Sequence, residues 1–116
     1  MKRQEAEQAG RRAEDGAAEY LAAKGWTVLA RRRRTPVGEI DLVVRRPGLV
    51  AFVEVKWRRS AAHLGDSIDE PRLARVAAAA EAVAHEYMQP GDDLSIDVLL
   101  LAPGTPPRHI RNAWQP

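Results

Sequence analysis

The sequence contains no cysteine, no long apolar run and no apolar segment near its start. The lack of cysteine excludes disulfides, thiolate zinc sites and a cysteine nucleophile, and it fits a reducing cytoplasm. No apolar stretch approaches the roughly 20 residues that span a bilayer, and segment 1–12 lacks the apolar core of a secretory signal. We therefore expect a cytoplasmic protein with no membrane partner.

Histidine is scarce as well. His63, His85 and His109 are scattered along the chain and show no metal-ligand spacing. We interpret His85 as a residue on a helix face. No motif supports Ser-His-Asp catalysis, so the candidate chemistry must come from carboxylates and basic side chains.

The length of 116 residues fits a single domain over 1–116, and the 45% apolar content is enough for one core. Positive charge is concentrated in the middle of the chain. Segment 24–59 has ten Lys/Arg and three Asp/Glu, whereas segment 60–116 has four Arg and eight acids. A basic segment around a few acids suits a polyanion-binding site with a metal. A solvated basic surface is the alternative.

Periodicity predicts helices over about 4–24 and 70–88, and strands over about 26–33, 38–45, 49–57 and 94–102. Segments 60–68 and 103–107 are predicted loops, and 109–114 is a candidate short final strand. Short links between the first three strands favour antiparallel hairpins, and the aliphatic strand 94–102 is expected to be central. The order α-β-β-β-α-β, with one further strand optional, predicts an α/β sandwich around a mixed sheet.

Two of the predicted strands carry acids at neighbouring ends. Because side chains alternate along a strand, Glu39 and Asp41 should share one face, as should Glu54 and Lys56. The opposite faces are expected to be purely apolar: Ile40, Leu42 and Val44 on the second strand, and Leu49, Ala51, Val53 and Val55 on the third. In the first strand we expect Trp26, Val28 and Ala30 on one side. An antiparallel hairpin then places Asp41 within reach of Glu54.

These residue types suit metal-assisted hydrolysis of a phosphodiester. Mg²⁺ and Mn²⁺ prefer hard oxygen ligands, often one or two carboxylates. A neighbouring lysine such as Lys56 can orient the attacking water or stabilise charge on phosphorus. A lone Glu-X-Lys is more often a cross-strand ion pair, and Asp41 on the preceding strand favours the catalytic interpretation.

Several segments carry a resemblance to a known family. They are Gly10-Arg11-Arg12-Ala13-Glu14, Tyr20-Leu21, Gly25-Trp26, Leu29-Ala30-Arg31, Gly38-Glu39-Ile40-Asp41-Leu42, Phe52-Val53-Glu54-Val55-Lys56, Ile96-Asp97-Val98 and His109-Ile110-Arg111-Asn112-Ala113. The set is similar to the PD-(D/E)XK nuclease superfamily. More closely, it resembles the bacterial YraN family (UPF0102), whose members resemble archaeal Holliday-junction resolvases. The resemblance covers nearly the whole chain and implies a restriction-endonuclease-like α-β-β-β-α-β sandwich.

The resemblance also implies residue roles. Asp41 and Glu54 would bind Mg²⁺ or Mn²⁺, Lys56 would be the catalytic lysine, and Glu14 would be a further metal-binding and catalytic acid. Helical phase allows this, since Glu14 falls at the edge of the apolar stripe of the first helix, whereas Glu19 falls on the opposite face. For Glu39 an outer-ligand role and an ion pair with an arginine stay equally open.

Three positions depart from the family's pattern. Ile40 replaces the superfamily's proline before the first acid, as is usual in YraN-like chains. Trp57 follows the lysine where a small polar residue is usual, and it would stack on a base or sugar or simply pack. Arg33 stands where the family often has an aromatic residue. The metal ligands are untouched, and the departures concern local substrate contacts.

Basic side chains flank the acidic strands and are candidates for phosphate contacts, which fix position without reading sequence. The candidate nucleic-acid-binding residues are Arg31, Arg33, Arg34, Arg58, Arg59 and Trp57. Surface arginines are often simply solvated, and we expect that of about half of the chain's flanking arginines. No recognition-helix or zinc-finger motif is present, so recognition by shape is favoured over base readout.

The sequence thus favours a metal-dependent endonuclease that acts on DNA, with branched structures as one candidate substrate and a homodimer as one candidate assembly. The first alternative is a catalytically inactive nuclease-fold module that binds nucleic acid or a DNA-processing partner. The second alternative is an α/β domain with no nucleic-acid role. An intact set of two acids and a lysine favours the enzyme.

Overall fold

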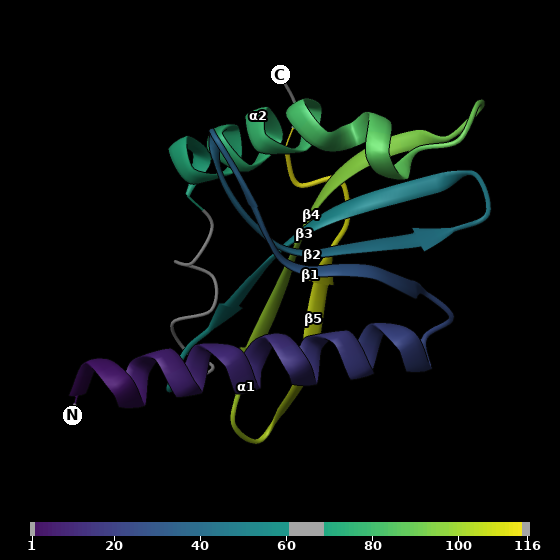
Figure 1. Cartoon of the computed structure of the whole chain (residues 1–116). Helices are drawn as coiled ribbons and strands as arrows, with labels where there is room; N and C mark the ends of the chain where they lie inside the picture. Colours follow the sequence, from purple (N-terminus) through teal and green to yellow (C-terminus); the bar gives the residue numbers. More distant parts are fainter. Residues whose placement is uncertain (1, 61–68, 115–116) are drawn as a thin grey trace.

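A five-stranded sheet lies between two long helices in the computed structural model, which describes residues 2–60 and 69–114 (Figure 1). The elements are α1 (Lys2–Ala23), β1 (Thr27–Thr35), β2 (Gly38–Arg46), β3 (Leu49–Trp57), α2 (Glu70–Tyr87), β4 (Asp93–Ala102) and β5 (Thr105–Ile110). The order α-β-β-β-α-β-β confirms the predicted α/β class and is consistent with a restriction-endonuclease-like fold.

The strands follow their sequence order across the sheet, β1-β2-β3-β4-β5. β1, β2 and β3 pair antiparallel, β3 and β4 pair parallel, and β4 and β5 pair antiparallel. A parallel pair needs a crossover connection, and the segment that contains α2 provides it. The mixed sheet, the two hairpins and the interior position of β4 are confirmed.

The helices cover opposite faces of the sheet, α1 on the lower side and α2 on the upper side of Figure 1. Both faces are therefore apolar, and the core has two parts. One lies beneath α2 and joins Leu73, Val76, Ala79, Ala80 and Val83 to Ile40, Val43, Val50, Phe52, Ile96, Val98 and Leu100. The other lies against α1 and joins Ala17, Ala18 and Leu21 to Trp26, Leu42, Val44, Ala51, Val53 and Leu99.

The predicted alternation in the first strand is wrong after Val28. Trp26 and Val28 pack in the core against α1, but Ala30 packs in the core beneath α2. The cause is a register shift between Val28 and Ala30, where β1 has one residue more than β2. Such a bulge moves the following side chains to the other face.

The end of the chain also differs from the prediction. The segment 103–107 was expected to be a loop and 109–114 a strand, but β5 runs from Thr105 to Ile110. Its two prolines, Pro106 and Pro107, are tolerated because β5 is the outermost strand and pairs only with β4. Most of the predicted loop over 60–68 lies outside the described residues.

Within 2–60 and 69–114, neither helix is both long enough and apolar enough to cross a membrane. The expected location in the cytoplasm stays a prediction.

The C-terminal end of α1 is fixed by an arginine that comes from β2. Gly25 takes a left-handed φ of 96° just after the helix, as a glycine can at low cost. Arg46 donates from Nη2 to the carbonyl oxygen of Lys24 at 2.6 Å. The same guanidinium lies 4.4 Å from the ring centroid of Trp26, which is 4% exposed. Arg46 therefore both caps α1 and covers a core aromatic.

We expect Arg46→Ala to lower the free energy of unfolding by about 1–2 kcal/mol, since a helix-end hydrogen bond and a cation–π contact are lost together. Arg46→Lys should lower the free energy of unfolding by a smaller amount, because it keeps a cation near the Trp26 ring. Urea denaturation with Arg108→Ala as an exposed control measures both. A change within ~0.5 kcal/mol for Arg46→Ala, the range of ordinary surface changes, would contradict this role.

Candidate metal centre

Asp41 sits where β2 and β3 separate. The pairing of these strands runs from Arg46 opposite Leu49 to Leu42 opposite Val53, and it stops there. Asp41 would face Glu54 at the next position. Instead, an oxygen of the Asp41 carboxylate, Oδ2, accepts a hydrogen bond from the Val55 N–H at 2.8 Å. The side chain thus takes the place of a main-chain acceptor and is held at the split.

This split overturns the predicted alternation in β2. Ile40 was expected on the same face as Leu42 and Val44, but it packs beneath α2 with Val43. Residues 38–41 no longer pair with β3 and continue only beside β1, so the strand turns between Leu42 and Ile40. The expectation for β3 is confirmed: Val50 and Phe52 lie beneath α2, and Leu49, Ala51, Val53 and Val55 lie on the α1 side.

Glu54 is a buried carboxylate with basic neighbours on one oxygen. Its side chain is 3% exposed. Oε1 accepts from Arg72 Nε at 2.9 Å and lies 3.8 Å from Lys56 Nζ. A buried carboxylate needs such partners, because burial without them is costly. The predicted proximity of Glu54 and Lys56 is therefore observed, together with a third partner from α2.

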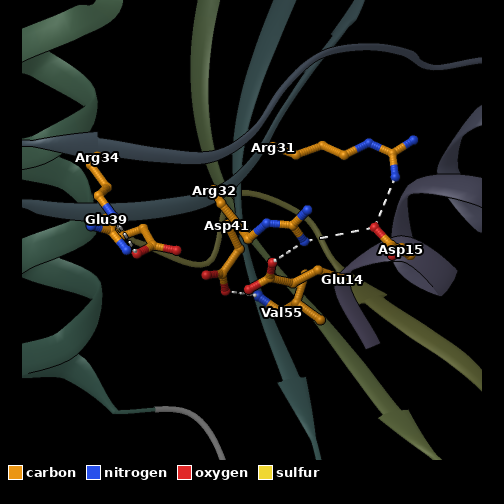
Figure 2. A network of polar contacts seen from close by, with 8 residues as sticks. All are labelled: Glu14, Asp15, Arg31, Arg32, Arg34, Glu39, Asp41 and Val55. Atoms are coloured by element: carbon orange, nitrogen blue, oxygen red, sulfur yellow. Dashed lines mark hydrogen bonds and ion pairs between the residues drawn. The ribbon is translucent and has the colours of Figure 1, made fainter. Parts of the chain in front are cut away.

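Glu14 approaches the same place from α1. Its side chain is 15% exposed, and Oε2 accepts from Arg32 Nη1 at 3.0 Å. Figure 2 shows the Glu14 carboxylate beside that of Asp41 and next to the Val55 N–H. The helical phase therefore predicted the direction of Glu14 correctly, and Glu19 is exposed as expected.

The acids meet in one cavity of about 430 Å³. It is bounded by α1, the β2 side of the split, β3 and the first turns of α2. The lining residues are Glu14, Val37, Gly38, Glu39, Asp41, Glu54, Arg72, Arg75 and Val76. Three of the four predicted catalytic residues line it, and Lys56 lies beside it through its contact with Glu54.

The acids are crowded enough to disturb their protonation. The pKa of Asp41 is raised to about 8. Burial is the largest cause, the Glu54 and Glu14 carboxylates add to it, and the hydrogen bond from the Val55 N–H opposes them. Burial also raises the pKa of Glu14, against the hydrogen bond and charge of Arg32. A bound cation would favour the charged form of these closely spaced carboxyl groups.

The pKa of Lys56 is shifted in the opposite direction, to a lower value. Burial lowers the pKa of its ammonium, Arg72 and Arg58 lower it further, and Glu54 raises it. A lysine with a lowered pKa can exchange protons more readily near neutral pH than an exposed one.

The donor set fits a hard divalent cation. Glu14, Glu39 and Asp41 each offer one oxygen, and these oxygens lie within 4.8 Å of one another. Glu54 lines the same cavity. Carboxylate oxygens are the ligands that Mg²⁺ and Mn²⁺ prefer. For Glu39 the sequence left two roles open, an outer metal ligand and an ion pair with an arginine. The structure is compatible with both, because Glu39 lies in this acidic group and its Oε2 is 3.8 Å from Arg34 Nε.

The arginines of β1 are occupied by acids of the same chain. Arg31 pairs with Asp15 at 3.0 Å, Arg33 with Glu86 at 2.7 Å and Arg34 with Glu39 at 3.8 Å. Figure 2 shows two of these pairs and the Arg32–Glu14 contact around the cavity. Of the three predicted phosphate-binding arginines in β1, only Arg34 is largely exposed, at 89%. Their contact with nucleic acid stays a prediction.

The remaining predicted nucleic-acid contacts lie past the end of β3. Trp57 is 41% exposed, which leaves part of the residue accessible to a base or sugar. Arg58 donates to the Trp57 carbonyl oxygen at 2.9 Å, and Arg59 is exposed. These side chains remain candidates for substrate contacts.

Sequence reasoning missed Arg72 and Arg75. They line the cavity from the first turns of α2. The available signal was the spacing of three residues, which places two arginines on one helix face directly after the Asp69 cap. Of the histidines, His85 lies in α2 as expected and is exposed. His109 contacts Asp97 rather than the acidic group, and His63 lies outside the described residues.

Comparison with known proteins gives a consistent result. The profile of the uncharacterised protein family UPF0102 matches residues 13–101. A UPF0102 protein of Erythrobacter litoralis is 66% identical over 116 residues, and one of Sphingopyxis alaskensis is 55% identical over 116, each covering 100% of both chains. A UPF0102 protein of Rhizorhabdus wittichii is 46% identical over 113 residues, which cover 97% of this chain and 96% of the relative.

Proposed function

The chain belongs to the uncharacterised protein family UPF0102, and from the residues that its fold brings together we propose that it is a metal-dependent endonuclease that hydrolyses phosphodiester bonds in DNA. One observation carries the proposal. The helix α1 and the hairpin of β2 and β3 deliver Glu14, Asp41 and Glu54 to one cavity, and Lys56 lies 3.8 Å from Glu54. An ordinary structural ion pair does not require three converging carboxylates.

In this proposal Asp41, Glu54 and Glu14 hold Mg²⁺ or Mn²⁺. When bound, such an ion polarises the phosphate and lowers the pKa of a bound water. Lys56 moves a proton at the attacking water or stabilises charge on phosphorus. Its lowered pKa supports the first role. The Arg72 bond keeps the Glu54 carboxylate in place.

DNA is the proposed substrate because the acidic strands lie in the basic segment of the chain. The resemblance to junction-cutting nucleases makes branched DNA the first structure to test. The sequence has no recognition-helix or zinc-finger motif, which favours recognition of shape over base readout.

The test is a cleavage assay on fluorescent duplex, flap and four-way-junction DNA with Mg²⁺, Mn²⁺ or EDTA. We expect cutting only with a metal. Glu54→Ala should reduce it by more than ~100-fold, the upper range when even an outer-shell partner of a metal is lost.

Two results would count against the enzyme. Intact DNA under every condition would refute hydrolysis. Binding without cutting, unchanged or tighter in Glu54→Ala, would identify a binding module instead.

A further inference from the structure

Arg72 faces the acids across the cavity. It lies in the first turn of α2, which Asp69 caps by accepting from the Arg72 main-chain N–H. Its side chain is 47% exposed, whereas the Glu54 side chain that it contacts is 3% exposed. Arg72 thus reaches from the rim of the cavity to a buried acid.

The contact uses only part of the guanidinium. An arginine has five N–H donors in one plane. Within the described residues, the Arg72 side chain makes one hydrogen bond, from Nε to Glu54 Oε1 at 2.9 Å. The four N–H donors on its two terminal nitrogens are left for a further acceptor. A planar fork of this kind matches the oxygens of a phosphate.

Arg75 adds a second cation one turn further along α2. It lines the same cavity and is exposed. It makes no hydrogen bond or ion pair with any residue in the described part of the chain. The arginines of β1 differ, because Arg31 and Arg33 are already paired with acids at 3.0 and 2.7 Å. Among the residues that line the cavity, the cationic donors are therefore on α2.

We propose that Arg72 and Arg75 bind a backbone phosphate of the nucleic acid at the cavity, and that Arg72 also positions the Glu54 carboxylate. This inference rests on the proposed function. The α2 side of the cavity then supplies the donors for phosphate oxygens, and the opposite side supplies the carboxylates. Arg72 acts on Glu54 as a positioning residue and on the substrate directly.

Phosphate binding is tested by fluorescence anisotropy with DNA over a series of salt concentrations, in EDTA and in Ca²⁺. Each phosphate contact to duplex DNA contributes about 0.9 to the slope of log affinity against log salt. Arg72→Gln and Arg75→Gln should each lower the slope by about that amount. Arg108→Gln removes the same charge from an exposed position in β5, so an effect of lost charge alone would lower the slope in this control as well.

Positioning is tested by Mn²⁺ binding, measured by calorimetry. Arg72→Lys keeps the charge but loses the Nε donor, so Mn²⁺ affinity should fall about 10-fold, as for other outer-shell partners. Arg75→Lys should leave Mn²⁺ affinity unchanged. Unchanged Mn²⁺ affinity in Arg72→Lys would overturn the positioning role.

The two proposals fail separately. Wild-type protein that binds DNA and Mn²⁺ but never cuts would overturn the hydrolase alone. Wild-type protein that cuts, while Arg72→Gln and Arg75→Gln bind DNA like Arg108→Gln, would overturn the phosphate assignment alone.

Discussion

Asp41→Asn is expected to abolish metal-dependent cleavage and, in the same protein, to raise the stability of the metal-free fold. The activity is lost because an amide replaces a charged ligand at the centre of the acidic group. The fold gains stability because Asp41 is buried against the Glu54 and Glu14 carboxylates, and asparagine removes that repulsion. Its side-chain oxygen can still accept from the Val55 N–H.

The stability gain should depend on pH. The pKa of Asp41 is about 8 in the fold and near 3.9 in an unfolded chain. Between these values the folded protein holds a proton that the unfolded chain has released, so Asp41 lowers stability as pH rises through this range. The difference between Asp41→Asn and wild type should therefore grow from about pH 4 to about pH 8.

Thermal unfolding in EDTA at pH 5 and pH 8 measures this difference, with Asp93→Asn, at the exposed start of β4, as a control. A gain of ~1 kcal/mol corresponds to a few degrees in Tm for a domain of this size. Loss of cleavage together with a lower Tm at pH 8 would show that Asp41 is needed for folding and is not strained by its neighbours.

The second large effect is expected at Asp97, which is fully buried in β4. Its Oδ2 lies 2.8 Å from His109 Nε2, and its Oδ1 accepts from the Asn112 N–H at 2.9 Å and from the Ser95 hydroxyl. Asn112 takes a left-handed φ of 53° there. One carboxylate thus ties the segment that follows β5 to the middle of the sheet.

Asp97→Ala should lower the free energy of unfolding by about 3–5 kcal/mol, because a fully buried carboxylate is removed and its three partners lose their acceptor at once. Asp97→Asn keeps one acceptor oxygen and should lower the free energy of unfolding by a smaller amount. Urea denaturation measures both, and Asp93→Ala on the same strand should stay within ~0.5 kcal/mol of wild type. A loss below ~1 kcal/mol for Asp97→Ala would show that the network adds little to stability.

Acid should weaken the same network. Burial alone would raise the pKa of Asp97, but the hydrogen bonds from His109, Ser95 and Asn112 outweigh it and hold the pKa below its usual value. A lowered pKa means that the contribution to stability is complete above the unfolded value of about 3.9. It is lost as pH falls through the folded value. Asp97→Asn should remove this acid-dependent part.

The strand and helix periods were enough to predict part of the candidate site. The period of two placed Glu54 beside Lys56, and the period of 3.6 turned Glu14 toward the sheet. The period failed at Ile40, because the β2–β3 pairing stops at Leu42. The sequence does not predict where β2 and β3 separate, because the separation depends on the hydrogen bond between the Asp41 carboxylate and the Val55 N–H.

Two further features depended on tertiary contacts. Arg72 resembles any solvated arginine on a helix until α2 packs over Glu54. The motifs around Asp97 and His109 carried a family resemblance but no role, because the two residues lie 12 positions apart in the sequence and only the β4–β5 pairing brings them together. β5 was misplaced because prolines weigh against a strand, although an outermost strand accepts them.

The sheet has two edge strands, β1 and β5, and the run of arginines in β1 protects one of these edges. An unprotected edge strand can pair with strands of other molecules and cause aggregation. Charged side chains, bulges and prolines in edge strands counteract this pairing. β1 combines the arginines with a bulge after Val28 and a left-handed φ of 50° at Arg32, and β5 has Pro106 and Pro107. The arginines that pair with acids around the cavity therefore also keep the fold from growing into a larger sheet. A homodimer stays a prediction.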